Sequence, residues 1–131
     1  MTISIARPVV EHTDIVRVLV VDDSDDQRLL LRTYFERAGC VVTEAVNAEE
    51  ALAFCSESQP DLAVIDLILP GMDGWALTHQ LRLDRPDCVI AITSVLDTEE
   101  YPVAQAALPK PVTGAHVRQV LREWVPKWTE R

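Results

Sequence analysis

The sequence predicts a doubly wound α/β fold, in which helices cover both faces of a five-stranded parallel sheet. Two observations support this prediction. Short apolar runs, typical of buried strands, alternate along the chain with longer segments of helical periodicity. Several of these runs also end abruptly in a polar residue, as expected where a buried strand leaves a sheet. Strands that alternate with helices in this way form parallel sheets with right-handed crossovers.

The first strand and the first helix are marked most clearly. Residues 15–21 read IVRVLVV and end in Asp22-Asp23, which predicts a buried strand that opens into a polar loop. Ser24 and Gln27 have the spacing of a helix-capping box, and Gly39 provides the stop for a helix of about four turns. A β-α unit therefore begins the domain.

The unit is repeated in the middle of the chain. Residues 41–45 form the second predicted strand, and Asn47 has the position of an N-cap for a helix that ends near Ser56. The third strand, at residues 62–65, ends at Asp66. Asp66 therefore occupies the same place after its strand as Asp22-Asp23 occupies after the first.

The last third of the chain completes the pattern, with weaker signals. The predicted elements are a helix at 75–83, a strand at 89–93, a short helix within 98–106, a brief strand at 107–108 and a helix at 113–124. Pro126 ends the last helix and leaves Trp124 and Trp128 near its end. We expect these indoles to cover the edge of the core, with a partner contact as the alternative.

Length and composition indicate one globular domain. The 131 residues, 48% of them hydrophobic, suit a single core, which we place at residues 15–126 between an N-terminal extension at 1–14 and a C-terminal tail at 127–131. A net charge of −9 argues against direct nucleic-acid binding. No segment approaches the roughly 18 apolar residues of a membrane span, and the three cysteines lack disulfide or zinc spacing. We therefore expect a cytoplasmic protein.

Five polar residues are predicted to meet at one edge of the sheet. Asp22, Asp23, Asp66, Thr93 and Lys110 each follow or end a strand, and ligands of open α/β sheets bind at this edge. One aspartate after a strand is usually a helix cap or a turn residue, so the combination carries the argument. Clustered carboxylates repel one another and favour a bound cation; their oxygen ligands suit Mg²⁺, which phosphate groups often help to bind. Phosphoryl transfer is the natural chemistry for such a site.

Four motifs at these positions resemble the response regulator receiver family of CheY-like proteins. They are VLVVDDS, VIDLILPGMDG, AIT and LPKP, and the resemblance covers about residues 16–125. It implies a flavodoxin-like sheet with the strand order 2-1-3-4-5, in a stand-alone receiver of a two-component phosphorelay. The expected partners are a sensor histidine kinase or a His-containing phosphotransfer protein, and an unidentified downstream protein. It implies neither an enzyme nor binding to nucleic acid or membrane; the alternative is a phosphorylation-independent adaptor.

The resemblance also assigns roles to individual residues. Asp66 would be the phosphoacceptor, and Mg²⁺, with Mn²⁺ as a substitute, would bind Asp22, Asp23, Asp66 and the backbone carbonyl of Ile68. Lys110 would bind the phosphoryl group, and a cis bond to Pro111 would aim its ammonium inward. Thr93, assisted by Ser94, would be the switch hydroxyl. The alternatives are that Thr93 only ends a strand and that Lys110 is a solvated loop residue.

The sequence departs from the family pattern around the switch. Ala107 stands three residues before the lysine, where receivers usually carry an aromatic residue, and Tyr101-Pro102 interrupts the expected fourth helix. We therefore expect a short or irregular fourth helix, with Tyr101 as a candidate replacement for the aromatic. Ile68 and Val95 are predicted to flank the phosphoryl site with apolar side chains, which would exclude attacking water and favour a long-lived phosphoryl-aspartate.

Overall fold

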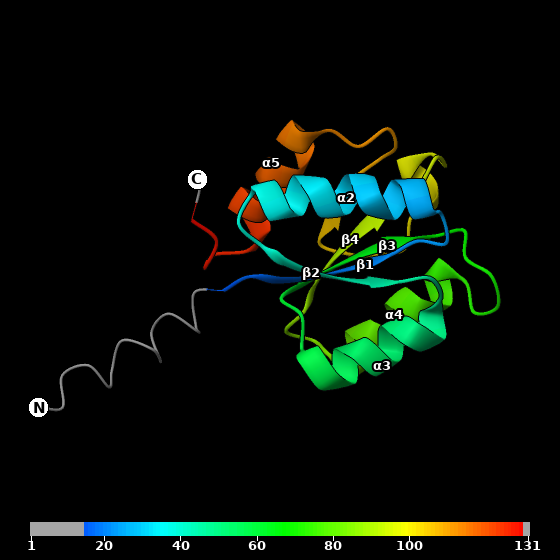
Figure 1. Cartoon of the computed structure of the whole chain (residues 1–131). Helices are drawn as coiled ribbons and strands as arrows, with labels where there is room; N and C mark the ends of the chain where they lie inside the picture. Colours follow the sequence, from blue (N-terminus) through cyan, green and yellow to red (C-terminus); the bar gives the residue numbers. More distant parts are fainter. Residues whose placement is uncertain (1–14, 130–131) are drawn as a thin grey trace, which may run out of the picture.

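A computed structural model of the chain describes residues 15–129. The predicted N-terminal extension and the last two residues of the tail lie outside the described residues. The five strands are β1 (Arg17–Val21), β2 (Val41–Ala45), β3 (Leu62–Asp66), β4 (Val89–Thr93) and β5 (Ala106–Ala107). The helices are α2 (Asp25–Arg37), α3 (Ala48–Ser58), α4 (Gly74–Asp84) and α5 (Gly114–Trp124) (Figure 1). All strand pairs are parallel, in the order β2-β1-β3-β4-β5, which confirms the predicted fold class.

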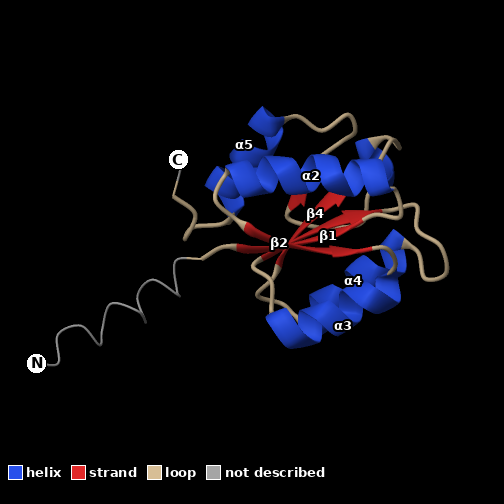
Figure 2. Ribbon diagram, in the orientation of Figure 1, coloured by secondary structure: helices blue, strands red, loops and turns tan. Residues whose placement is uncertain are grey.

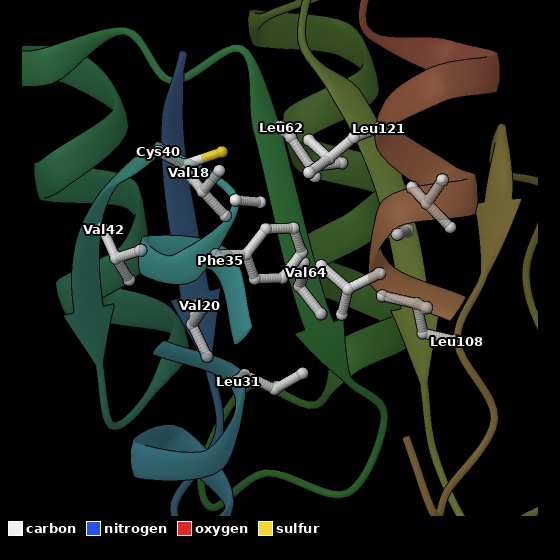
Figure 3. Packing of buried hydrophobic residues seen from close by; sticks show 14 of the residues in the cluster. Val18, Val20, Leu31, Phe35, Cys40, Val42, Leu62, Val64, Leu108 and Leu121 are labelled. Carbon is white, nitrogen blue, oxygen red and sulfur yellow. The ribbon is translucent and has the colours of Figure 1, made fainter. Parts of the chain in front are cut away.

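The helices form two layers, with α2 and α5 on one face of the sheet and α3 and α4 on the other (Figure 2). Alternation along β1 feeds both sides: Val18 and Val20 belong to the cluster beneath α2 and α5, while Leu19 and Val21 belong to the cluster above α3 and α4. In the first cluster the ring of Phe35 lies among aliphatic side chains of the sheet and helices (Figure 3). Burial on both faces explains the apolar runs of the central strands β1, β3 and β4, whereas the edge strand β2 carries Thr43 and Glu44.

Side-chain caps begin the helices near the predicted positions. The hydroxyl of Ser24 accepts from the backbone N–H of Gln27 at 3.2 Å, and the Asn47 side chain accepts from the N–H of Glu50 at 2.8 Å. The capping box at Ser24 is not reciprocal, however. The N–H of Ser24 donates to the carboxylate of Asp22 at 2.9 Å, so the Gln27 side chain does not cap it. The start of α2 is thereby coupled to the acidic loop.

The connection between β4 and β5 confirms the expected irregular fourth helix. Within residues 94–105, all of which the structure describes, the only helix is a 3-10 turn at Thr98–Glu100. Two aromatic side chains hold this connection: the indole N–H of Trp75 donates to the carbonyl of Glu100 at 2.9 Å, and the hydroxyl of Tyr101 donates to the carbonyl of Ser94 at 3.2 Å. Strand β5 has only two residues, one position earlier than predicted.

A C-terminal tryptophan and three cysteines also contribute to the core. The indole N–H of Trp128 donates to the carbonyl of Ala38 at 2.8 Å and the ring packs against the first cluster, as expected; Trp124 is 41% exposed. The three cysteines are buried thiols, and burial raises the pKa of Cys88 to about 12. Among residues 15–129, none of the helices has the length and apolar character that crossing a bilayer requires.

Candidate functional site

The fold brings the predicted polar residues together at the carboxyl ends of the central strands. Asp22 follows β1, Asp66 ends β3, and Thr93 ends β4 in direct register with Asp66. Lys110 follows β5 and reaches back to the acidic residues. In the strand order, β1 and β3 are neighbours. The connection after β1 leads towards β2 and the connection after β3 leads the opposite way, towards β4, which leaves a crevice between them at the carboxyl ends of the strands.

Asp22, Asp23 and Asp66 form a compact acidic cluster. One carboxylate oxygen from each lies within 4.8 Å of the others. Asp22 is fully buried and Asp66 is 4% exposed, whereas Asp23 is exposed. Hard oxygen donors at this spacing, open to solvent on one side, fit a divalent cation such as Mg²⁺, which keeps several of its own waters.

Lys110 is the cation that the protein itself provides. Its ammonium donates to Asp22 Oδ2 and to Asp66 Oδ2, at 3.1 Å in each case. The peptide bond to Pro111 is cis, as the resemblance implied, and the backbone N–H of Lys110 donates to the carbonyl of Ser94 at 3.0 Å. Lys110 is therefore not a solvated loop residue.

The pKa shifts reflect a crowded, partly desolvated group of charges. Burial lowers the pKa of Lys110, but the negative charges of Asp22 and Asp66 outweigh it and the net pKa is raised. The pKa of Asp22 is also raised, chiefly by burial and further by the charge of Asp66, although the Ser24 N–H and Lys110 act in the opposite direction. The attraction between Asp22 and Lys110 is thus weaker than the desolvation penalty on the Asp22 carboxylate.

Backbone and hydroxyl groups surround the carboxylates. The N–H of Ile68 donates to Asp66 Oδ1 at 3.1 Å, which fixes the turn after β3. The hydroxyl oxygen of Thr93 is buried and has no hydrogen-bond partner within the described part of the chain. The side chains of Ile68 and Val95 are 54% and 76% exposed, so the apolar groups predicted to flank the site are solvent-accessible.

Arg28 is a buried charged residue beside the site that the sequence analysis missed. It is 9% exposed, and its Nη1 donates to the backbone carbonyl of Asp22 at 2.8 Å. Its Nε donates to Glu44 at 3.0 Å, and Nη2 pairs with Asp25. Helical spacing could have indicated its burial, because Arg28 lies three residues before Leu31 and therefore on the buried face of α2.

Gly74 is a second position whose importance the sequence did not reveal. As the first residue of α4, it packs directly on the turn after Asp66 and donates its N–H to the carbonyl of Leu67 at 3.0 Å. A Cβ at this position would lie 2.4 Å from both the carbonyl oxygen of Asp66 and the Cα of Leu67. The glycine is required by close approach of two backbone segments.

Sequence comparisons agree with this geometry. A family model described as a response regulator receiver domain matches residues 18–122. The transcriptional regulatory protein ResD of Bacillus subtilis (strain 168) is 38% identical over 84 residues, which cover 64% of this chain and 35% of ResD. A 14.6 kDa protein encoded in the sodA1 3′ region of Leptolyngbya boryana is 35% identical over 115 residues, 82% of this chain and 88% of that protein. The chain spans about a third of the length of ResD.

Solved structures share the same architecture. A CheY-like response regulator receiver domain protein from Methanospirillum hungatei JF-1 superimposes with a TM-score of 0.77 at 26% sequence identity. The match covers 83% of this chain and 92% of that chain. The likeness therefore extends over most of the chain.

Proposed function

Because the chain belongs to the response regulator receiver family, we propose that it accepts a phosphoryl group on Asp66 from a histidine kinase or a His-containing phosphotransfer protein. The observation that carries the proposal is the convergence of Asp66 with Asp22 and with the ammonium of Lys110 at one edge of the sheet. The complete acidic cluster does not favour the adaptor alternative. We assign this activity to a domain spanning residues 15–126.

The chemistry follows from the position of the Asp66 carboxylate. A carboxylate oxygen of Asp66 attacks the phosphorus, a new P–O bond forms, and the P–N bond to the donor histidine breaks with its electron pair leaving on the imidazole. Lys110 already contacts Asp66 and would neutralise charge on the phosphoryl oxygens. Mg²⁺, held by Asp22, Asp23, Asp66 and the carbonyl of Ile68, would supply further neutralisation of that charge.

Signalling would begin at the hydroxyl of Thr93. This oxygen is buried and has no hydrogen-bond partner among residues 15–129, so a phosphoryl group on Asp66 would offer it an acceptor. The adjacent residue, Ser94, gives its carbonyl to both the Lys110 N–H and the Tyr101 hydroxyl. This contact supports a role for Tyr101 in place of the aromatic residue missing at Ala107. The downstream partner would be a protein that recognises the rearranged segment.

Phosphorylation by a small-molecule donor tests the proposal directly. After incubation with Mg²⁺ and acetyl phosphate, we expect intact-mass spectrometry to show one added phosphoryl group, and peptide masses to place it on Asp66. Asp66→Asn should gain none. Asp87→Asn is the matched control, because this exposed aspartate lies at the opposite edge of the sheet and its variant should be phosphorylated like the parent. Equal phosphorylation of the parent and Asp66→Asn would refute the assignment.

The lifetime of the phosphoryl-aspartate should depend on Ile68 and Val95. We expect the double variant Ile68→Asn, Val95→Ala to lose its phosphoryl group about tenfold faster than the parent, because a polar and a smaller side chain would admit attacking water; this corresponds to about 1.4 kcal/mol in the barrier. The decay of phosphoprotein, followed by mass after donor removal, measures it. Leu83→Asn, which alters an exposed leucine on α4, should leave the rate unchanged. A parent lifetime no longer than that of the double variant would contradict the idea.

A further inference from the structure

Arg28 connects three separate parts of the fold beside the acidic cluster. Its guanidinium contacts the carbonyl of Asp22 at the end of β1, the carboxylate of Glu44 on β2 and the carboxylate of Asp25 in the first turn of α2. The planar guanidinium offers donors in fixed directions, which a flexible ammonium cannot do. One side chain therefore fixes the β1–α2 turn relative to the neighbouring strand.

Asp22 is the residue that this arrangement constrains most. Its backbone N–H donates to the carbonyl of Ala45 at 3.1 Å, and its carbonyl accepts from Arg28 at 2.8 Å. Its carboxylate accepts from the Ser24 N–H at 2.9 Å and from Lys110 at 3.1 Å. The backbone N–H, the carbonyl and the carboxylate of Asp22 are thus all hydrogen-bonded, and the direction of its side chain is fixed before any ligand binds.

The charge of Arg28 is opposite to what a cation site needs. A buried positive group near three carboxylates disfavours a second cation through space, although Glu44 and Asp25 offset part of that charge. The charge of Arg28 therefore gives no direct help to a cation bound by Asp22, Asp23 and Asp66. Its ion pairs with Glu44 and Asp25 hold the guanidinium in place, and its hydrogen bond to the Asp22 carbonyl connects it to the cation site.

We propose that Arg28 is a positioning residue that holds the β1–α2 turn in the geometry that Asp22 and Asp23 need to bind a divalent cation. The inference rests on the proposed function, because it concerns the cation of the phosphoryl site. The direction in which cation affinity changes when Arg28 is replaced tests the proposal. If Arg28 acts by position, its removal weakens cation binding; if it acts only by charge, its removal strengthens binding.

The experiment titrates the 131-residue chain with Mn²⁺ and measures free Mn²⁺ by electron paramagnetic resonance. Arg28→Met keeps most of the side-chain volume and removes the donors, and we expect the dissociation constant to rise by about tenfold or more. Arg32→Met is the matched control: Arg32 lies one turn along α2 and also pairs with Glu44, at 2.7 Å, but does not contact Asp22. Its dissociation constant should stay within about twofold of the parent value.

A second variant keeps the test decisive if Arg28→Met does not fold. Arg28→Lys retains the charge but cannot span the three acceptors, and should also bind Mn²⁺ more weakly. Unchanged or tighter binding by Arg28→Lys, or by a folded Arg28→Met, would overturn the inference.

The outcomes also separate this inference from the proposed function. A parent protein that fails to bind Mn²⁺ would count against the cation site itself, and therefore against both. A parent that binds Mn²⁺, together with an Arg28→Met variant that is less stable to urea but equal in affinity, would leave the cation site in place and reduce Arg28 to a structural residue.

Discussion

Gly74→Ala is expected to lower the free energy of unfolding by about 3 kcal/mol and to reduce phosphorylation of Asp66. The added Cβ would lie 2.4 Å from the carbonyl oxygen of Asp66 and from the Cα of Leu67, and both are backbone atoms that cannot rotate away. To relieve this clash, the turn after β3 must move away from the start of α4. We therefore expect a loss of stability at the upper end of the usual range for overpacking. The same movement would displace the Asp66 carboxylate. Urea unfolding and acetyl phosphate labelling measure the two effects.

Gly114→Ala provides the matched control for Gly74→Ala. Gly114 is likewise the first residue of its helix, but a Cβ there would meet only the ring of Tyr34, at 3.4 Å. Because alanine favours helix more than glycine does, we expect a change of less than about 1 kcal/mol in either direction. Equal stability of the two variants would show that the close approach of Gly74 to the Asp66 turn carries no energetic weight.

Asp22→Asn is expected to change stability in opposite directions with and without Mg²⁺. In the metal-free protein, Asp22 is fully buried beside Asp66 and its pKa is raised, so its ionisation favours the unfolded chain. This destabilisation develops as pH rises from the unfolded-state pKa and is complete above the folded-state pKa. Asparagine removes the charge and keeps an oxygen for the Ser24 N–H, so the metal-free variant should melt at a higher temperature than the parent at neutral pH.

Mg²⁺ should reverse that order. At a concentration of about 100 times its dissociation constant, a ligand stabilises the folded state by about 2.7 kcal/mol, and we expect the parent to gain this and Asp22→Asn to gain almost none. Thermal melts with Mg²⁺ and with a chelator measure both effects, and Asp87→Asn should behave as the parent does. A variant that is less stable than the parent in chelator and keeps the full gain with Mg²⁺ would contradict both parts.

The sequence predicted the central strands and the acidic cluster because both depend on local signals. Each central strand is buried on both faces over most of its length, so it contains a run of four apolar residues, and the carboxyl ends of parallel strands lie at the same edge of the sheet. The predicted position of β5, at residues 107–108, was one residue too late. The strand has two residues, and the N–H of Ile90 donates to the side chain of Gln105 at 2.9 Å, so a side chain takes part of the role of the edge strand.

Arg28 and Gly74 were missed because their roles depend on tertiary contacts. An arginine on a helix is usually solvated, and nothing in the local pattern indicates that the carbonyl of Asp22 lies within reach of Arg28. Gly74 stands in a segment rich in turn residues, where a glycine is expected for conformational freedom. Its actual constraint is the 2.4 Å separation that a Cβ would have from the Asp66 backbone.

The connection between β4 and β5 affects how stability is distributed between this segment and the rest of the domain. A complete helix there would bury an apolar face and unfold together with the sheet. Here a single 3-10 turn is tethered by Trp75 and Tyr101, while Val95 and Val103 remain largely exposed. We expect such a segment to open at a lower free-energy cost than global unfolding, although Leu96, Tyr101 and Ala104 pack against the second cluster. Under the proposed function, a phosphoryl group on Asp66 would supply one new hydrogen bond at Thr93, and only a small free-energy difference would have to be overcome to rearrange this segment.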